Sequence, residues 1–373
     1  MTTANREEPA APVRRRRIGP VLALVVLAPV VAEVLPGFTR VTAIPFAILP
    51  ELGIWGCGAV LIRELTRRRG LGWASMVVLG IALAVAEEFV IQQTSLAPLA
   101  GLAVWEYGRA GGVNLVYALW ALGYESVWVV VLPVLLVELL YPDRREQPWL
   151  TGRGIAVASA VFIVASTAAW FQWTQYARVQ IFHLPPYQAP PQAIAAAVGG
   201  IGLLAVLALS LPAARRLGPR LPLPGPWALG LAVLVLSLPW FLLVTLALLA
   251  WPVAATPPWL ALAAGAVWAG AVLLPALAWT GAPGWRDAHR LALIAGAVGA
   301  AMVGGWALFL VGGASPVDGA GMLLLDLLAV LWIVRFARAG CPPRSEGEGT
   351  PISGSRPDRS APRPRAGPRA PSP

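Results

Sequence analysis

Residues 63–95 read RELTRRRGLGWASMVVLGIALAVAEEFVIQQTS, and this stretch decides the fold. It opens with an arginine-rich turn and continues as an apolar run long enough for a membrane helix. The adjacent carboxylates Glu87 and Glu88 lie deep within that run. A carboxylate in the hydrocarbon core costs about 2.5–3.5 kcal/mol on insertion scales. The pair therefore predicts a functional site inside a bundle of membrane helices.

The composition is that of an integral membrane protein. Hydrophobic residues make up 58% of the 373 positions and charged residues 12%, against roughly 25% charged in soluble domains. The net charge is +10, and all 28 basic residues are arginine. These arginines flank apolar runs or lie in the tails, which predicts contacts with the bilayer and its anionic headgroups and excludes a nucleic-acid partner. The composition also points to a bacterial plasma membrane, and it indicates no cofactor or particular protein partner.

Ten apolar runs approach the ~20 residues that a bilayer core requires. The first, Ile18–Pro36, is expected to be a retained signal anchor, although its basic flank and short core also fit a cleaved signal peptide. The others are residues 41–62, 73–94, 113–140, 154–171, 192–212, 227–250, 258–279, 290–312 and 320–338. The predicted fold is all-α, a polytopic transmembrane helix bundle of about ten spans.

Arginines alternate between the connections as the positive-inside rule requires. If the N-terminus is inside, the external connections hold only Arg40, Arg109 and Arg178, and the internal ones hold the rest. Both the N- and C-termini should therefore be cytoplasmic. Tryptophans near the predicted span ends support the same boundaries.

We divide the chain into five segments. They are a basic cytoplasmic N-terminus (1–17), a four-helix module with the carboxylates (18–141), a cytoplasmic linker (142–153), a six-helix scaffold module (154–338) and an Arg/Pro-rich cytoplasmic tail (339–373). The tail has almost no apolar residue to bury, so it is expected to be disordered.

Acidic residues within the spans concentrate in the first four helices. At a rise of about 1.5 Å per residue, Glu51, Glu87, Glu88 and Glu125 could meet at one level of the membrane. The last six spans offer only Asp326 away from their ends. The first four spans therefore form the candidate site, and the others are interpreted as scaffold.

Three further acids receive simpler interpretations. Glu33 and Glu138 lie close to the ends of their spans, where a carboxylate can snorkel to the membrane interface. Asp326, near the middle of the last span, is expected to make a structural hydrogen bond.

Helical spacing adds polar neighbours to the carboxylates. Glu88 shares a helix face with Gly80, Ala84, Gln92 and Ser95, which recur every three or four residues. A second polar stripe on the fourth span begins at Asn114. The two stripes predict a water-accessible cavity that binds protons or substrate through Glu51, Glu87, Glu88, Gln92, Asn114, Tyr117 and Glu125. Alternatively, these groups only hydrogen-bond neighbouring helices.

Neighbouring carboxylates in a low dielectric repel one another and lose hydration. At least one of Glu87 and Glu88 is therefore expected to be protonated at neutral pH, or neutralised by a cation. No arginine lies at that depth, which leaves a proton or a bound metal. The only histidines, His183 and His289, fall on opposite sides of the predicted membrane, so a zinc site built from histidine and carboxylate is not expected.

The segment Glu87-Glu88-Phe89-Val90-Ile91-Gln92 resembles the first motif of the CPBP family, the CAAX protease and bacteriocin-processing intramembrane proteases. In that motif an arginine stands four positions after the second glutamate, where this chain has Gln92. The family's later helices supply histidines that help to activate water, and residues 124–128 contain none. The resemblance covers about one helix and part of another. It implies that Glu87 and Glu88 are inherited catalytic positions in an enzyme whose activity is lost or altered.

The first 150 residues also resemble an uncharacterised group of bacterial multi-pass membrane proteins, from which no function carries over. Three functions stay open. The favoured one is a proton- or cation-linked transporter whose carboxylates exchange protons and bind substrate. The second is a CPBP-like intramembrane protease or its inactive descendant, with Glu87 and Glu88 activating water. The third is a structural or partner-binding membrane protein.

Overall fold

The apolar runs of the sequence form helices in the computed structural model, which describes residues 18–98, 107–211, 221–249, 256–312 and 315–339. Within these residues nine helices are long and apolar enough to cross a membrane: Ile44–Arg68, Trp73–Ile91, Leu115–Leu140, Gly152–Gln180, Pro191–Ser210, Pro226–Val244, Pro258–Thr280, Asp287–Leu310 and Pro316–Ala339. Ile18–Val34 is a shorter apolar helix. The prediction of an all-α bundle of apolar helices is confirmed.

The described part of the first 140 residues contains six α-helices interrupted by wide, π-helical turns. In order they are α1 (Ile18–Pro29), η1 (Val30–Val34), α2 (Ile44–Glu51), η2 (Leu52–Gly56), α3 (Cys57–Arg68), α4 (Trp73–Val85), η3 (Ala86–Ile91), α5 (Leu115–Tyr124), η5 (Glu125–Val131) and α6 (Leu132–Leu140). A two-stranded hairpin, β1 (Arg109–Ala110) with β2 (Val113–Asn114), precedes α5. The predicted N-terminal segment 1–17 lies outside the described residues.

The second part of the chain begins with a short 3₁₀ turn, η6 (Pro142–Arg144). It continues with α7 (Gly152–Phe171), η7 (Gln172–Ala177), α8 (Arg178–Gln180), α9 (Pro191–Ser210), α10 (Pro226–Leu249), α11 (Pro258–Thr280), α12 (Asp287–Gly312) and α13 (Pro316–Ala339). Four of these helices begin at a proline, whose fixed φ suits the first helical position and whose missing N–H is not needed there. Beyond Ala339, the predicted tail lies outside the described residues.

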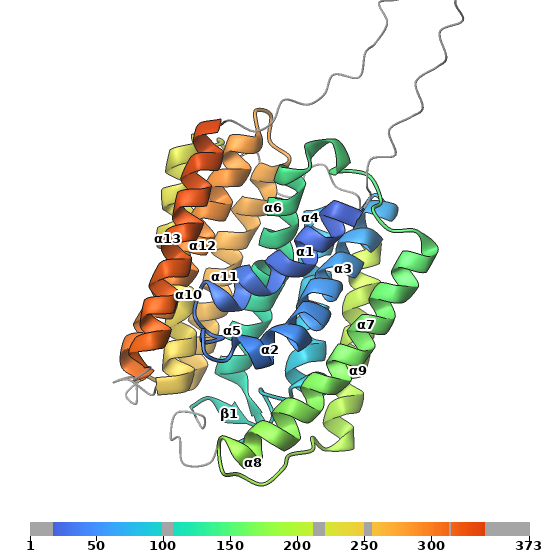
Figure 1. The fold of residues 1–373 in the computed structure, drawn as a ribbon, viewed down its shortest axis with the longest axis vertical. Helices are drawn as coiled ribbons and strands as arrows, with labels where there is room; N and C mark the ends of the chain where they lie inside the picture. Colours follow the sequence, from blue (N-terminus) through green and yellow to red (C-terminus); the bar gives the residue numbers. More distant parts are fainter. Residues whose placement is uncertain (1–17, 99–106, 212–220, 250–255, 313–314, 340–373) are drawn as a thin grey trace, which may run out of the picture. The chain divides into compact units, whose positions relative to one another are not determined.

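The helix formed by α5, η5 and α6 is the centre of the bundle. Of the most apolar part of Leu115–Leu140, 78% is buried, against 11% for Gly152–Gln180 and for Pro258–Thr280. Figure 1 shows α10 to α13 on one side and α7 and α9 on the other, with α12 packed along α10, and α9 against α4. The outer helices expose apolar side chains around most of their circumference, as helices facing lipid do.

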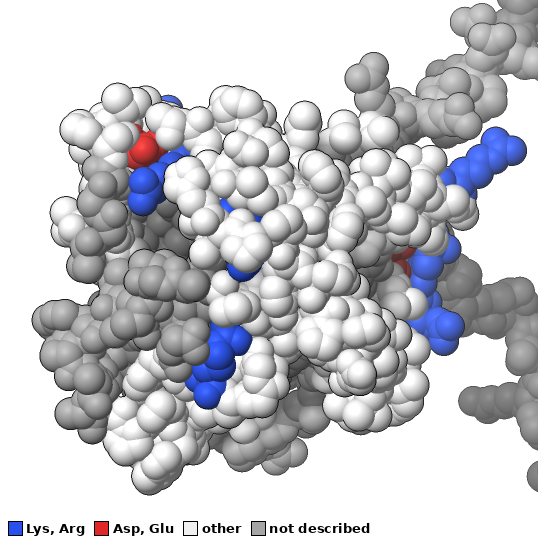
Figure 2. Space-filling model, turned by 90° about the horizontal axis from the view of Figure 1, so that it is seen from below, with Lys and Arg blue, Asp and Glu red and all other residues white. Residues whose placement is uncertain are grey.

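The acidic side chains are mostly hidden. On the face seen in Figure 2, uncharged side chains cover most of the described surface, blue arginine atoms form a few small groups, and little red is visible. Many glutamates of the first four spans are buried.

A column of stacked aromatic rings runs along the central helix. Trp120 stacks on Tyr124 with a centroid distance of 4.9 Å, and Tyr124 stacks on Trp128 at 5.1 Å. This contact follows from their spacing of four residues, which places them on one helix face. Phe38 and Phe241 meet the Tyr124 ring edge-on at 5.4 and 5.9 Å. The column therefore joins the chain after η1 and α10 to the centre of the bundle.

Close helix packing depends on glycine at specific positions. A Cβ atom on Gly305 of α12 would lie 1.9 Å from the carbonyl oxygen of Pro36, and one on Gly56 would lie 2.4 Å from that of Val25. A Cβ atom on Gly200 of α9 would have nothing within 4 Å. Small residues allow backbones to approach in this way in membrane bundles.

We expect Gly305→Ala to destabilise the protein by about 1–3 kcal/mol or more, because the added methyl forces the backbone after η1 to move. The matched variant Gly200→Ala should be neutral, or more stable by up to ~1 kcal/mol, since alanine favours a helix over glycine. Thermal unfolding in one detergent measures both. Equal midpoints for the two variants would contradict the close packing of α12 on this turn.

Candidate functional site

Five glutamate side chains from four segments of the chain gather inside the bundle. They form the glutamate cluster: Glu33, Glu51, Glu87, Glu88 and Glu125. The last four of these are 7%, 2%, 3% and 8% exposed, in that order, whereas Glu33, taken as a whole residue, is partly exposed. The cluster therefore joins four buried residues to one that is partly exposed.

Every member of the cluster lies in or next to a π-helical turn. Glu33 lies in η1, Glu51 directly precedes η2, Glu87 and Glu88 lie in η3, and Glu125 begins η5. In η3 the N–H of residue 92 donates to the carbonyl of Glu87, five residues earlier, at 2.8 Å. Such turns are rare and are frequent at functional sites. The wide turn alters the 3.6-residue periodicity, so two adjacent glutamates can both reach Glu125.

The carboxyl groups of η3 and η5 are close neighbours. The side chain of Glu125 interacts with those of both Glu87 and Glu88. An ionised carboxylate only accepts hydrogen bonds, so two carboxyl groups can bond one another only when one of them carries a proton. Glu125 and the η3 pair are therefore placed where they can share a proton.

Neutral donors complete the shell of the η3 pair. The indole Nε1 of Trp55 donates to Glu87 Oε2 at 2.8 Å. The hydroxyls of Thr94 and Ser95 donate to Glu88 Oε2 at 2.7 and 2.6 Å. These donors can stabilise a carboxylate without adding a positive charge to the site.

A hydroxyl connects the two remaining glutamates. Thr39 Oγ1 lies 2.6 Å from Glu51 Oε1 and 3.4 Å from Glu33 Oε2. Oε2 of Glu51 and Oε2 of Glu125 are buried and accept no hydrogen bond from the described residues. Buried acceptors normally have partners, so these two oxygens are places where a ligand group or a proton can bind.

No arginine among the described residues neutralises the glutamate cluster. The groups that act on the cluster carboxylates are other glutamates and neutral donors. Nor do three histidine, cysteine or carboxylate side chains converge on one metal position in this part of the chain. His289 is 4% exposed and stacks on Trp285 at 5.5 Å, and neither it nor His183 is a neighbour of the cluster.

Asn114 and Tyr117, two other residues of the predicted site, lie at the start of α5. Asn114 is fully buried, and its Oδ1 caps the helix by accepting from the N–H of Tyr117 at 3.0 Å. Its own N–H donates to the carbonyl of Ser95 at 2.9 Å, next to Glu88. The Tyr117 side chain has Glu88 and Glu125 as charged neighbours. Both residues thus border the cluster.

Gln92 follows directly after η3 and is partly buried. The glutamine that is enclosed is its neighbour Gln93, which is 1% exposed. Gln93 has φ +59° and ends the helix, and its Oε1 accepts from the N–H of Ala189 at 2.9 Å. A role of Gln92 in binding stays a prediction.

Thr39 and Trp55 were not predicted from the sequence. Trp55 lies inside an apolar run, where an indole N–H usually finds a partner, so it could have been suspected. Thr39 lies in the connection between two spans, and nothing local distinguishes it. Only the fold brings it between Glu33 and Glu51.

The snorkelling predicted for Glu33 and Glu138 is wrong. Glu33 belongs to the glutamate cluster. Glu138 is 2% exposed and accepts from Arg63 Nε at 3.1 Å and from Arg67 Nε and Nη2 at 2.8 and 2.7 Å. Since α3 and α6 run side by side, the two arginines offer Glu138 a better partner than the membrane interface does. The structural hydrogen bond predicted for Asp326 is confirmed, because its Oδ2 accepts from Trp306 Nε1 at 2.8 Å.

The position of Arg63 near the end of a span predicted a contact with lipid headgroups, but the structure places it elsewhere. It is 0% exposed, and Nη1 and Nη2 donate to the carbonyls of Gln147 and Arg145 at 2.7 and 2.6 Å. Its guanidinium carbon lies 3.6 Å from the centre of the Trp149 ring. Arg63 therefore fastens the α6–α7 connection to the end of α3.

We expect Ser95→Ala to destabilise the fold by about 1–3 kcal/mol, because it removes a buried hydrogen bond to the Glu88 carboxylate. Ser210→Ala is the matched control, since Ser210 is exposed and its hydroxyl bonds only the preceding turn of its own helix at Val206. Thermal unfolding compares the two variants. An unchanged midpoint for Ser95→Ala would show that this hydroxyl does not support Glu88.

No family model matches the chain, and neither the curated proteins nor the solved structures include a match. The functional proposal therefore depends on the geometry of the glutamate cluster.

Proposed function

We propose that the protein is a proton-linked transporter of the bacterial plasma membrane, with about ten spans and cytoplasmic termini. The observation that carries the proposal is the glutamate cluster: five neighbouring carboxyl groups inside a membrane bundle, with no arginine neutralising them among the described residues. Intramembrane acids of this kind mark proton relays and ion pathways.

The contacts of the cluster suggest a path for protons. Glu33 is the one member that is partly exposed as a residue, and the Thr39 hydroxyl between it and Glu51 can both accept and donate a proton. Glu51 is in turn a charged neighbour of Glu87, which is itself a neighbour of Glu125. Protons would enter at Glu33 and reach the buried pair through these groups.

The same groups favour a cationic or amine-bearing substrate. Each proton that leaves the cluster leaves a negative charge in a low dielectric, and a substrate cation can neutralise that charge. Oε2 of Glu51 and Oε2 of Glu125 are buried acceptors that receive no hydrogen bond from the described residues, and a substrate N–H could donate to them. Proton and substrate would then compete for one site, which is the condition for exchange.

Reconstituted vesicles test this proposal. Purified protein in liposomes, with a pH difference across the membrane, should accumulate at least one member of a panel of labelled cations and amines well above protein-free vesicles. Dissipating the pH difference with a protonophore should remove that accumulation. Uptake that is indifferent to the pH difference would refute proton coupling.

An intramembrane protease remains a second candidate because η3 holds both Glu87 and Glu88 at one buried site, as the resemblance to the CPBP family implies. Neither histidine of the chain is a neighbour of that pair, so the pair alone would have to activate water. Cleavage of a membrane-embedded peptide by the same vesicles, with no flux, would favour this candidate. If neither activity is found, the polar groups have a structural or partner-binding role.

A further inference from the structure

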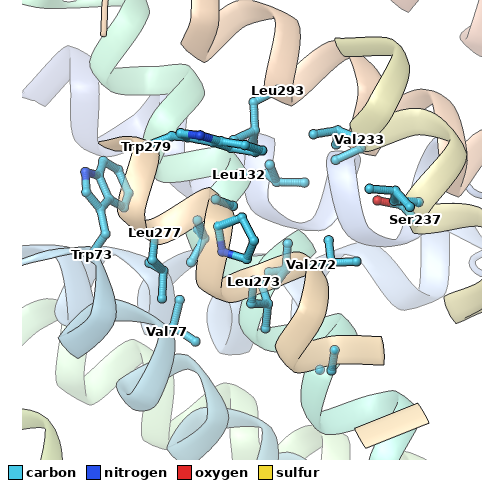
Figure 3. Close-up of a pocket in the computed structure, with 18 of the residues that line it drawn as sticks. Trp73, Val77, Leu132, Val233, Ser237, Val272, Leu273, Leu277, Trp279 and Leu293 are labelled. Carbon is cyan, nitrogen blue, oxygen red and sulfur yellow. The ribbon is translucent and has the colours of Figure 1, made fainter. Parts of the chain in front are cut away.

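A second site lies apart from the glutamate cluster. A half-open cavity of about 180 Å³ is lined by α4, the central helix, α10, α11 and α12, and no member of the cluster lines it. Figure 3 shows the indole of Trp279 along one side of the cavity and that of Trp73 beside it, with Leu132 and Leu293 on the walls. The cavity thus lies between two helices of the predicted four-helix module and three of the predicted scaffold.

The chemistry of the walls selects a hydrocarbon ligand. Besides tryptophan N–H groups, the polar lining side chains are Ser237 and Thr280, and the Thr280 hydroxyl already donates to the carbonyl of Leu277 at 2.7 Å. An apolar cavity of about 150 Å³ stays dry and binds benzene-sized molecules. Because the surrounding helices are membrane spans, the hydrocarbon at hand is the acyl chain of a lipid.

The ends of the helices set the direction in which a lipid would enter. Trp73 is the first residue of α4, Trp279 is in the last turn of α11, and Trp285 precedes α12, so three lining tryptophans lie at helix ends. Tryptophan prefers the level of the headgroups. The neighbour of Trp285, Arg286, is exposed and forms no ion pair with the described residues. A positive charge next in sequence to a lining tryptophan suits an anionic headgroup.

We propose that this cavity binds a segment of one acyl chain of an anionic phospholipid whose phosphate contacts Arg286. The site does not depend on the glutamate cluster or on transport. Its lining residues Gly123, Val127 and Trp128 belong to the same helix as Glu125, so the lipid would pack against the central element of the bundle.

Native mass spectrometry of the full chain in detergent tests the proposal. The protein is titrated separately with phosphatidylglycerol and phosphatidylcholine of identical acyl chains, and the Kd of the first bound lipid is measured. Ala276→Phe fills the cavity from α11 and should weaken phosphatidylglycerol binding at least tenfold. Ala263→Phe, on an exposed face of the same helix and outside the cavity, should leave the Kd unchanged. Arg286→Gln should reduce the affinity for phosphatidylglycerol to that for phosphatidylcholine.

Each outcome decides one part of the proposal. Equal phosphatidylglycerol affinity in Ala276→Phe and the parent protein would overturn the cavity as the binding site. Equal affinity of the parent protein for the two lipids would overturn the choice of an anionic lipid. Ala232→Leu, which adds less volume and does so from α10, provides the same test if Ala276→Phe lowers thermal stability.

Discussion

Replacing both Glu87 and Glu88 by glutamine is expected to abolish pH-driven uptake in reconstituted vesicles. Glutamine keeps nearly the same volume and can still hydrogen-bond Glu125, Trp55 and Ser95. It cannot take up or release a proton. If the cluster exchanges protons, the double variant should therefore fold and yet show uptake no greater than protein-free vesicles.

Asp326→Asn is the matched control for this experiment. Asp326 is also buried in a membrane helix, at 7% exposed, but it bonds Trp306 outside the cluster. Its substitution should leave uptake within about twofold of the parent protein. Undiminished uptake by the glutamine double variant would refute the proton-exchange role of the pair. If that variant instead loses cleavage of a membrane peptide, and the parent protein shows no flux, the protease proposal takes its place.

Substitution of Arg63 by alanine is expected to give the largest loss of stability, about 3–5 kcal/mol. The change leaves Glu138 buried with part of its positive partner removed, and breaking a buried pair is costly in this range. It also removes the donors to the carbonyls of Gln147 and Arg145. We expect a thermal midpoint several degrees lower in the same detergent.

Arg69→Ala controls for the loss of one positive charge at the same helix end. Arg69 is exposed and no ion pair joins it to the described residues, so the thermal midpoint should hardly change. Equal midpoints for Arg63→Ala and Arg69→Ala would mean that the buried network does not stabilise the fold. Protease digestion of the α6–α7 connection gives a second measure, since that connection should be cut faster only in Arg63→Ala.

The helices could be predicted from the sequence because their signal is long and local. Runs of about 20 apolar residues, with tryptophans near their ends, identify spans without knowledge of their neighbours. The central position of Leu115–Leu140, which is 78% buried, could not be predicted from the residues of that helix alone. Its apolar surface resembles that of helices that face lipid. The sequence pattern therefore predicted where the spans lie along the chain, but not which span lies at the centre of the bundle and which spans surround it.

The candidate site was predicted less completely, for two physical reasons. Depth along straight helices suggested that Glu51, Glu88 and Glu125 could meet, but it excluded Glu33, whose helix widens at η1. The 3.6-residue period assigned Gln92 and Ser95 to the face of Glu88; Ser95 does bond Glu88, but the second bond comes from Thr94, which was not assigned to that face. A π-helical turn shifts the angular position of every following residue around the helix axis. The local sequence does not indicate where such a turn forms.

The π-helical turns have a mechanical consequence. Neighbouring residues of an α-helix are about 100° apart around its axis, so moving a wide turn along a helix by one residue swings the side chains it passes by roughly that angle. Such a migration exchanges one backbone hydrogen bond for another and leaves both ends of the helix in place. A carboxyl group at η3 could then turn from one neighbour to the next as its charge changes, inside a bundle whose framework stays still.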